Sequence, residues 1–599
     1  MLRFRASKGF SAVVCLVLSS ALAAQDEPRT DQSAATLVIT HVTVIDATGA
    51  PAQPDATVVV RGDRITEIGK TGKAPMPKAA RVVDGRGKFL IPGLWDMHVH
   101  LDFRDYLQLF IANGVTGVRV MWGDPQHHAW REEIEAGSLL GPRMKIASPI
   151  IDGPKPYWPG SVSVANEAEA RQAVATAKKH GADFVKIYQF LPRALYFDLA
   201  DESKKEGISF EGHLPVTVRA EEGSRAGQKS FEHLVGILPA VSTRSDELFK
   251  AAQDDFAAMQ SRGKFEELHD SPLGREMLAT YSTERVAALS AVFKSNGTWQ
   301  CPTLVLLHMF AYGNEADFRN DPRLKYLPPH LKRSWDPTKL EGERTAQDFD
   351  YSRREFDRDL QVVGAMGKAG VGILAGTDSQ NPYTFYGFSL HDELGFLVQA
   401  GLSPMQALQA ATLNPALFFG MEKDLGTIRK GKIADLVLLD ANPLDAIGNT
   451  KRIDAVIYGG KFYSRAALDQ MLATAEALAA RPLIGDVLFK AIKENGIEAA
   501  VQQFHALKAT QPDAYDFSEG ELVGLGYVLL HQKQYKEAIE VFKLSVETYP
   551  KSYNTYDSLG EAYMDDGNKD LAITNYEKSL QLNPDNRNGI EMLKKLRAP

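Results

Sequence analysis

Eight short apolar runs between residues 91 and 422 constrain the fold of this chain more than any other feature. The first two are GLWDMHVH and GVTGVRVM, the last is VGILAGTD, and amphipathic stretches such as EAEARQAVATAKKHG separate most of them. Buried strands that alternate with helices form parallel sheets, and eight such units close a barrel. The sequence therefore predicts an α/β domain over 91–422, a (β/α)8 TIM barrel.

Two β-rich stretches flank the predicted barrel. Residues 24–90 contain TLVITHVTVIDATG and DATVVVRGDRITEIGK, and residues 423–465 contain KGKIADLVLLD and RIDAVIYGGKFY. β-branched residues alternate with polar ones, and Gly, Asp and Pro interrupt the runs, which is the pattern of antiparallel strands. We expect the two stretches to form one small, split β-sandwich domain.

The C-terminal part contains a repeat of 34 residues. The matching pairs are Leu525 and Leu559, Gly526 and Gly560, Ala538 and Ala572, Phe542 and Tyr576, and Pro550 and Pro584. Ala500, Phe504 and Pro512 form a preceding, degraded copy. This period and residue order resemble tetratricopeptide repeats, with a generic helical hairpin as the alternative. We predict a linker helix over 466–484 and an all-α repeat domain over 485–599, whose stacked helices bind a protein or peptide partner.

The first 23 residues predict a signal peptide. Arg3, Arg5 and Lys8 precede FSAVVCLVLSSALA, an apolar run too short to cross a bilayer, and small residues suited to cleavage follow at 21–23. We expect an exported protein, periplasmic or secreted, with no stable membrane insertion after cleavage. An uncleaved anchor is the alternative.

Charge and cysteine content exclude further classes of function. The formal net charge is -8, which argues against nucleic acid as a partner, because phosphate binding needs a basic surface. Cys15 lies in the signal peptide, so Cys301 is the only cysteine left after cleavage. We therefore expect no intramolecular disulfide and no thiolate metal site, and Cys301 should fill the core of the seventh strand.

Ionisable residues end five of the predicted strands. They are His98, His100, Lys186, His213, His233 and Asp378. His98 and His100 are two residues apart and share one face of a strand, and barrel enzymes place catalytic groups at these strand ends. Buried ionisable groups are costly unless they are paired or bound to metal, so the cluster indicates a divalent-metal site. Hydrogen-bonded core histidines, or an ordinary lysine beside a single metal ion, are the alternatives.

Over residues 36–465 the sequence resembles the amidohydrolase superfamily. PGLWDMHVH, the strand-4 lysine, the two single histidines and AGTDS carry this resemblance. GHLPVTVRAEEGSRAGQKSFEHL and HDELGFLVQAGLSPMQALQAATLNPA are similar to the branch of imidazolonepropionase-like proteins and metal-dependent Xaa-Pro dipeptidases. The resemblance implies two divalent metal ions. Zn²⁺ is the expected metal, and Mn²⁺ and Co²⁺ are the alternatives. The resemblance assigns the more buried ion to His98, His100 and Asp378, the more exposed ion to His213 and His233, and a CO2-derived carbamate on Lys186 as the bridge.

The resemblance also implies a reaction. A hydroxide held by both metals would attack an amide-type C–N bond, and Asp378 would carry the proton to the leaving group. The substrate would be a small molecule or dipeptide, as in prolidases or N-acyl amino acid hydrolases. A lactonase, phosphoesterase or deaminase on the same centre is the alternative within enzymes, and an inactive tetratricopeptide scaffold is the alternative from another class.

Substrate contacts are predicted from position alone. Tyr188 should point to the same side of the strand as Lys186 and donate a hydrogen bond to the substrate; the alternative is a tyrosine that only packs in the core. His391 should lie at the barrel rim after the eighth strand and contact the substrate; the alternative is a histidine that faces solvent. Further candidates are Arg119, Tyr157, Trp158, Arg353 and Arg354. His127 and His128 lie in a polar helical stretch and are interpreted as surface residues. Residues 311–350, rich in Pro, Arg and Asp, are expected to form a loop over the barrel mouth. The sequence leaves open whether the protein forms a homo-oligomer.

Overall fold

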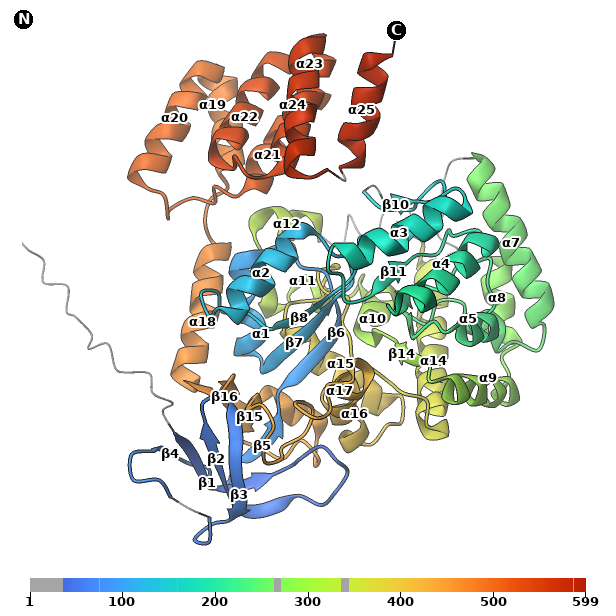
Figure 1. Ribbon diagram of the computed structural model, residues 1–599, viewed down its shortest axis with the longest axis vertical. Helices are drawn as coiled ribbons and strands as arrows, with labels where there is room; N and C mark the ends of the chain where they lie inside the picture. Colours follow the sequence, from blue (N-terminus) through green and yellow to red (C-terminus); the bar gives the residue numbers. More distant parts are fainter. Residues whose placement is uncertain are drawn as a thin grey trace, which may run out of the picture.

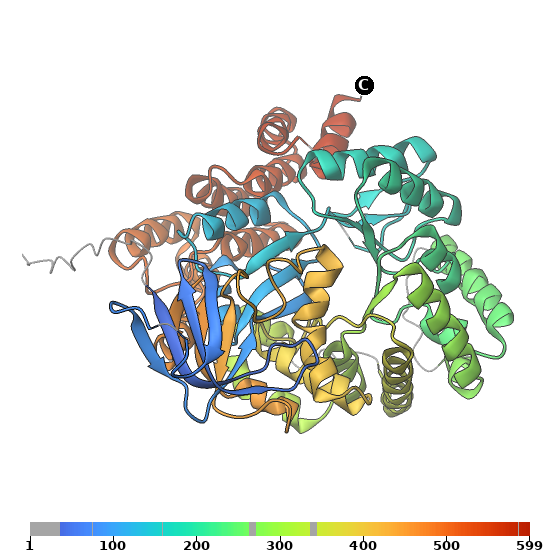
Figure 2. The same cartoon turned by 60° about the horizontal axis from the view of Figure 1, so that its bottom comes forward.

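The computed structural model describes residues 36–598 except 75, 159, 263–270, 336–343 and 585. The predicted signal peptide, residues 1–23, lies outside the described residues. In Figure 1 a β-rich part lies at the bottom, an α/β part in the middle and a helical array at the top, and Figure 2 brings the β-rich part forward. Within the described part of the chain, no helix has both the length and the hydrophobicity that crossing a bilayer requires.

Parallel strands build the central part. They are β6 (Leu94–Val99), β7 (Val115–Val120), β8 (Arg143–Ile146), β9 (Ile151–Asp152), β10 (Val162–Ser163), β11 (Val185–Ile187), β12 (Phe210–Gly212), β13 (Ser230–Glu232) and β14 (Trp299–Cys301). One sheet has the order β6-β7-β8 and the other β10-β9-β11-β12-β13-β14. A parallel bridge between Ala147 and Phe184 joins the two sheets.

The eighth apolar run closes this arrangement without forming a regular strand. A parallel bridge links Ile373 to Gln300 of β14, and another links Ser379 to Val99 of β6. Parallel pairings therefore follow one another from β6 around to residues 373–379 and back to β6, as the predicted barrel requires. Gly376 permits this close approach, because a Cβ there would lie 2.5 Å from the Cys301 sulfur.

Helices cover the outside of the barrel. They are α1 (Gln108–Ala112), α2 (Pro125–Glu135), α3 (Glu167–Lys179), α4 (Arg193–Glu206), α5 (Ala220–Ala226), α9 (Thr283–Asn296), α14 (Ala346–Ala369), α15 (Phe388–Gln399), α16 (Pro404–Ala410) and α17 (Leu413–Phe419). Capping residues set their ends: the Asn166 side chain accepts the backbone N–H of Glu169 at the start of α3. Gly297 ends α9 with a φ of 68°, a left-handed conformation that favours glycine.

Two excursions leave the barrel after β13 and β14. The first contains α6 (Ile237–Ala240), α7 (Ser245–Arg262) and α8 (Pro272–Ala279). The second contains α10 (Leu304–Tyr312), α11 (Ala316–Arg319), η2 (Pro322–Tyr326) and α12 (Pro329–Ser334). The prediction of a loop over 311–350 is therefore wrong for most of its described residues, which are helical. His330 lies 3.2 Å from Glu521 and Arg333 lies 3.1 Å from Asp486, so this segment packs against the C-terminal helices.

Both ends of the barrel unit meet in one β-sheet. Its strands are β1 (Leu37–Val44), β2 (Gln53–Arg61), β3 (Arg64–Lys70), β4 (Arg81–Asp84), β5 (Phe89–Pro92), β15 (Leu436–Leu439), β16 (Ile453–Tyr458) and β17 (Lys461–Ser464). Their order is β17-β16-β15-β5-β1-β2-β3, and β4 pairs with β1. The sheet curls, because the Ile65 N–H donates to the carbonyl of Lys432, just before β15. Ile39 and Leu436 pack in a core of this sheet, whereas Val437 and Val456 join the barrel core.

The C-terminal part consists of helices joined by short connections. Its helices are α18 (Arg465–Ala479), α19 (Ile484–Asn495), α20 (Ile497–Thr510), α21 (Glu519–His531), α22 (Tyr535–Thr548), α23 (Tyr553–Asp565), α24 (Lys569–Leu582) and α25 (Arg587–Arg597). A Cβ on Gly526 would lie 2.4 Å from the Phe542 ring, and one on Gly560 would lie 3.2 Å from the Tyr576 ring. In each copy the glycine therefore packs against the aromatic residue 16 positions later, Phe542 or Tyr576, as the predicted repeat register requires.

Candidate metal centre

The structure brings all six predicted ligands to one place. His98, His100, Lys186, His213, His233 and Asp378 line a single cavity of about 930 Å³. The ring centroid of His233 lies 4.5 Å from that of His98 and 4.8 Å from that of His213. Residues from four strands and from the closing segment therefore converge as the strand-end pattern predicts.

Asp378 is the centre of this cluster. Its Oδ1 atom lies 3.0 Å from His100 Nε2 and 3.2 Å from His98 Nε2, and its Oδ2 atom lies 3.7 Å from His233 Nε2. Burial alone would raise the pKa of Asp378, but the charges of His98 and His233 hold it well below its usual range. The carboxylate is therefore ionised and faces three imidazoles.

His98 is oriented by a buried ion network beneath the cavity. Its Nδ1 atom lies 2.8 Å from Glu232 Oε2, so the ring N–H donates to the carboxylate. The Arg119 guanidinium donates to both Glu232 and Glu211 at 2.8 Å, and all three side chains are fully buried. This arrangement turns His98 Nε2 toward Asp378, as a carboxylate does for a metal-binding histidine.

Two buried atoms of the cluster, His98 Nε2 and Asp378 Oδ1, lie 3.2 Å apart, yet neither makes a hydrogen bond. Because the His98 ring donates its N–H from Nδ1 to Glu232, its Nε2 atom is an acceptor that faces another acceptor. Buried polar atoms are normally satisfied, so an orphaned pair calls for an explanation. Ligand atoms of His98, His233 and Asp378 all lie within 4.8 Å of one another. An imidazole nitrogen and a carboxylate oxygen are ligands that Zn²⁺ accepts, and a divalent cation between them would satisfy both.

Lys186 lies on β11 and is buried. Burial lowers its pKa to about 8, although the carboxylates of Glu232 and Asp378 oppose this shift. Its Nζ atom lies 5.9 Å from the centre of the Tyr188 ring, so the two side chains share one face of the chain, as predicted. The amine that the resemblance assigns to a carbamate therefore faces the cavity.

Tyr188 also lies where the sequence predicts it. Its ring stacks on His213 with a centroid distance of 4.0 Å. The indole N–H of Trp158 donates to the Tyr188 hydroxyl at 2.8 Å. Burial raises the pKa of Tyr188, so the phenol keeps its proton and can donate a hydrogen bond to a bound group. Tyr157 and Trp158 line the cavity as well.

The prediction that His391 contacts the substrate at the rim is wrong. This residue is buried on α15, where its Nδ1 atom lies 3.0 Å from Thr450 Oγ1 and its Nε2 atom lies 3.1 Å from the Asn113 carbonyl oxygen. The helix turns His391 toward η3 (Ile447–Lys451), on a side that does not line the cavity. Both ring nitrogens are engaged there, which leaves neither for a substrate.

Other candidates also lie elsewhere than predicted. His127 is buried and lines the cavity; its Nε2 atom lies 2.7 Å from the Leu101 carbonyl oxygen. Arg119 is inside the barrel and cannot meet a substrate. Arg353 pairs with Glu315, and neither it nor Arg354 lines the cavity. None of the described residues between 311 and 350 lines the cavity either, so the predicted cover comes from other segments.

Several residues of the site were missed by sequence reasoning. Glu232 and Asp96 stand in apolar runs, and a charged residue in a buried strand is itself a signal of pairing. Asp96 accepts the Thr377 backbone N–H at 3.0 Å and its hydroxyl at 2.7 Å, which ties β6 to the segment carrying Asp378. Tyr553 of α23 also lines the cavity, although it belongs to the repeats.

Comparisons with known proteins agree with this picture. Residues 329–463 match the model of the amidohydrolase family, and residues 522–552 and 553–586 match tetratricopeptide repeat models. Ochratoxinase from Aspergillus niger is 23% identical over 505 residues, which cover 72% of this chain and 88% of that protein.

Solved structures show the same fold. A bottromycin amidohydrolase superposes with a TM-score of 0.59 and 24% identity, covering 74% of this chain and 91% of its own. A Xaa-Pro dipeptidase with methionine in its active site superposes with a TM-score of 0.53 and 20% identity, covering 72% and 100%. The predicted resemblance and fold class are confirmed: residues 329–463 match the amidohydrolase family, the domain around them shares its TIM-barrel-type fold with an amidohydrolase and a Xaa-Pro dipeptidase, and tetratricopeptide repeats follow at the C-terminal end.

Proposed function

We propose that this protein is an exported, metal-dependent amidohydrolase that cleaves an amide-type C–N bond in a small molecule or dipeptide. The observation that carries the proposal is the convergence of the six strand-end residues on one cavity, where two buried ligand atoms, His98 Nε2 and Asp378 Oδ1, make no hydrogen bond. The names of its relatives, an ochratoxinase, an amidohydrolase and a Xaa-Pro dipeptidase, favour hydrolysis. Export rests on the sequence pattern of residues 1–23 alone.

The residues fit two divalent ions. His98, His100 and Asp378 would hold one ion, His213 and His233 would hold the other, and a carboxylated Lys186 would reach both. When bound, such ions, with Zn²⁺ expected, lower the pKa of a bound water and polarise a carbonyl oxygen. Without metal, the same pocket of buried imidazoles would be costly to maintain.

The chain's own residues would then handle the proton and the substrate. Asp378 is ionised and can accept a proton from the attacking water and pass it to the leaving amine. The Tyr188 hydroxyl accepts a hydrogen bond from Trp158, which leaves its own hydrogen to donate to a substrate oxygen. The cavity places both groups beside the imidazoles.

The repeats would add a second role. Tetratricopeptide repeats suggest binding of a protein or peptide partner. Because Tyr553 lines the cavity, the repeat domain also forms part of the wall around the substrate. We therefore expect partner binding to the repeats to influence turnover.

A hydrolysis screen tests this function. Xaa-Pro dipeptides, N-acyl amino acids and lactones are incubated with protein supplied with Zn²⁺ or Mn²⁺ in bicarbonate. Asp378→Asn should lower turnover at least ~100-fold, whereas Asp440→Asn, at an exposed carboxylate paired with Lys88, should retain it. Undiminished turnover in Asp378→Asn would refute the proton role. Turnover of lactones alone would favour the lactonase alternative, and an inert protein holding less than one metal per chain would favour the scaffold.

A further inference from the structure

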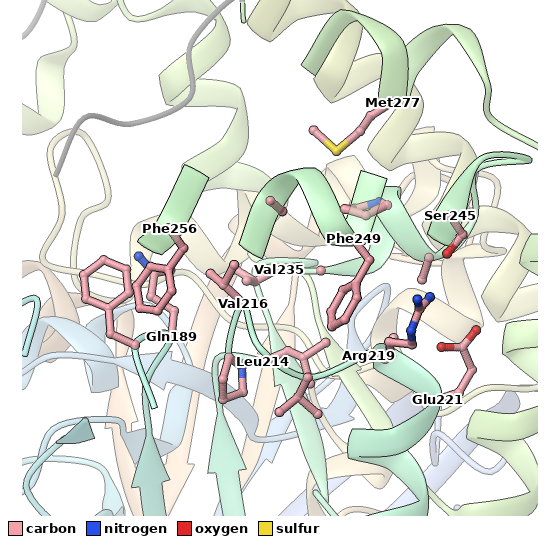
Figure 3. Close-up of a pocket in the computed structure, with 18 of the residues that line it drawn as sticks. Gln189, Leu214, Val216, Arg219, Glu221, Val235, Ser245, Phe249, Phe256 and Met277 are labelled. Carbon is pink, nitrogen blue, oxygen red and sulfur yellow. The ribbon is translucent and has the colours of Figure 1, made fainter. Parts of the chain in front are cut away.

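A second cavity adjoins the candidate metal centre. It has a volume of about 370 Å³ and is shown in Figure 3. The residues that line both cavities are Tyr157, Gln189, Val235, Gly236, Pro239 and Met277. The smaller cavity, here called the side pocket, therefore lies directly beside the space that holds the predicted ligands.

The side pocket begins where two predicted metal ligands end their strands. Leu214 follows His213 directly, and Val235 lies two residues after His233. Two residues of chain span at most about 7 Å, and the chain turns at His233 and Leu234, which both have positive φ. A substrate whose scissile bond lies beside these histidines would thus have its neighbouring substituent within reach of the side pocket.

Its walls are mainly apolar. Phe249 and Phe256 point from α7 toward Leu214 and Val216, as Figure 3 shows, and Met277 of α8 completes the lining from above. The rings of Phe256 and Phe190 lie 5.0 Å apart, so the pocket already contains an aromatic contact. Aromatic walls of this kind favour aromatic or large aliphatic ligands over charged ones.

Two charged residues line the side pocket, Arg219 and Glu221, and the arginine is already paired. Arg219 lies 2.9 Å from Asp246 and its guanidinium lies 4.3 Å over the Phe249 ring. The arginine is therefore not a free anion site. The volume exceeds twice the ~150 Å³ of an apolar cavity that accommodates benzene, so a phenyl or indole ring fits.

We propose that the side pocket binds an aromatic group of the substrate, adjacent to the bond that is cleaved. The inference rests on the proposed function and narrows its substrate class to amides or dipeptides with an aromatic side chain. The shared lining favours this occupant over a separate ligand, because a molecule in the side pocket would touch the same residues as the substrate.

Filling the side pocket tests the proposal. Ala252→Phe places a ring inside it, and Ala257→Phe introduces the same ring at an exposed position of α7. The substrates are N-acetylphenylalanine with N-acetylalanine, and Phe-Pro with Ala-Pro. Wild type should prefer the phenylalanine member at least ~10-fold in kcat/KM. Ala252→Phe should remove this preference while its turnover of the alanine member changes less than about twofold, and Ala257→Phe should resemble wild type.

The outcomes separate the side pocket from the proposed function. Hydrolysis without preference for the aromatic member, or an equal loss on both members in Ala252→Phe, overturns the side pocket and leaves the hydrolase intact. If no member is hydrolysed, the proposed function fails for these substrates. The side pocket is then tested by calorimetric binding of N-acetylphenylalanine amide to wild type and to both variants. Binding that is lost in Ala252→Phe alone supports the pocket, and equal affinities in all three proteins overturn it. Should Ala252→Phe fail to fold, Phe249→Ala is expected to weaken the aromatic members selectively, and an unchanged preference refutes the pocket.

Discussion

Glu232→Gln should weaken metal binding although Glu232 is not one of the predicted ligands. Its Oε2 atom accepts the His98 ring N–H at 2.8 Å, which keeps the opposite nitrogen, Nε2, free for a metal. A carboxylate in this position also makes the ring more basic. Losing such a partner costs about 10–100-fold in metal affinity, or about 1.4–2.8 kcal/mol.

Glu211→Gln is the matched control. Arg119 donates to Glu211 and Glu232 at the same distance, 2.8 Å, and each variant leaves it one carboxylate. Both variants should therefore lose unfolding free energy to a similar extent, each less than the ~3–5 kcal/mol of a fully broken buried pair. Glu211 also accepts the Ser209 hydroxyl, and within the described contacts it does not bond His98.

Zn²⁺ affinity is measured by competition with a chromophoric chelator, and stability by urea unfolding of the metal-free proteins. The reasoning requires Glu232→Gln to bind Zn²⁺ at least about tenfold more weakly than Glu211→Gln. Equal affinities in the two variants, at similar stabilities, would refute the role assigned to the His98 contact.

Three further predictions use other contacts. Tyr553 lines the cavity, so Tyr553→Ala should raise KM by about 2–10-fold, the equivalent of about 0.5–1.5 kcal/mol of lost aromatic contact. Tyr556→Ala on the same helix should leave KM unchanged, and equal KM values in the two variants would exclude a substrate contact by Tyr553. Burial lowers the pKa of His391 to about 4 from 6.5, so its neutral form stabilises the fold above pH 6.5 and this contribution is lost as pH falls toward 4. From pH 8 to pH 5, urea unfolding free energy should drop about 2 kcal/mol more in wild type than in His391→Gln, and an equal drop would contradict the burial. Trp158→Phe removes the donor to Tyr188 and should lower kcat/KM about 2–10-fold, with no added loss in a Tyr188→Phe background; additive losses would show that the two act separately.

The fold could largely be predicted because its signals are periodic. The Gly526 and Phe542 contact recurs one repeat later, so spacing alone defines the register. The strand-end residues could be found because parallel strands bring their carboxyl ends to one rim. The irregularity of the eighth strand could not be predicted. Gly376 lets the backbone pass close to Cys301, and residues 373–379 form isolated bridges instead of a regular ladder.

The remaining features depend on packing that one sequence does not encode locally. His391 follows the eighth strand as a rim residue would, but the rotation of α15 buries it against Thr450. His127 reads as polar helix surface, yet its ring accepts the Asp124 N–H and caps α2. Tyr553 reaches the cavity only because the repeats pack against the barrel, which no local pattern predicts.

The metal content of the purified protein tests the central claim most directly. After Zn²⁺ is supplied in bicarbonate and excess metal is removed, mass spectrometry should find two Zn²⁺ per chain in wild type and one in the His213→Ala, His233→Ala double variant. Less than one metal per chain in wild type, or the same content in both proteins, would contradict the account.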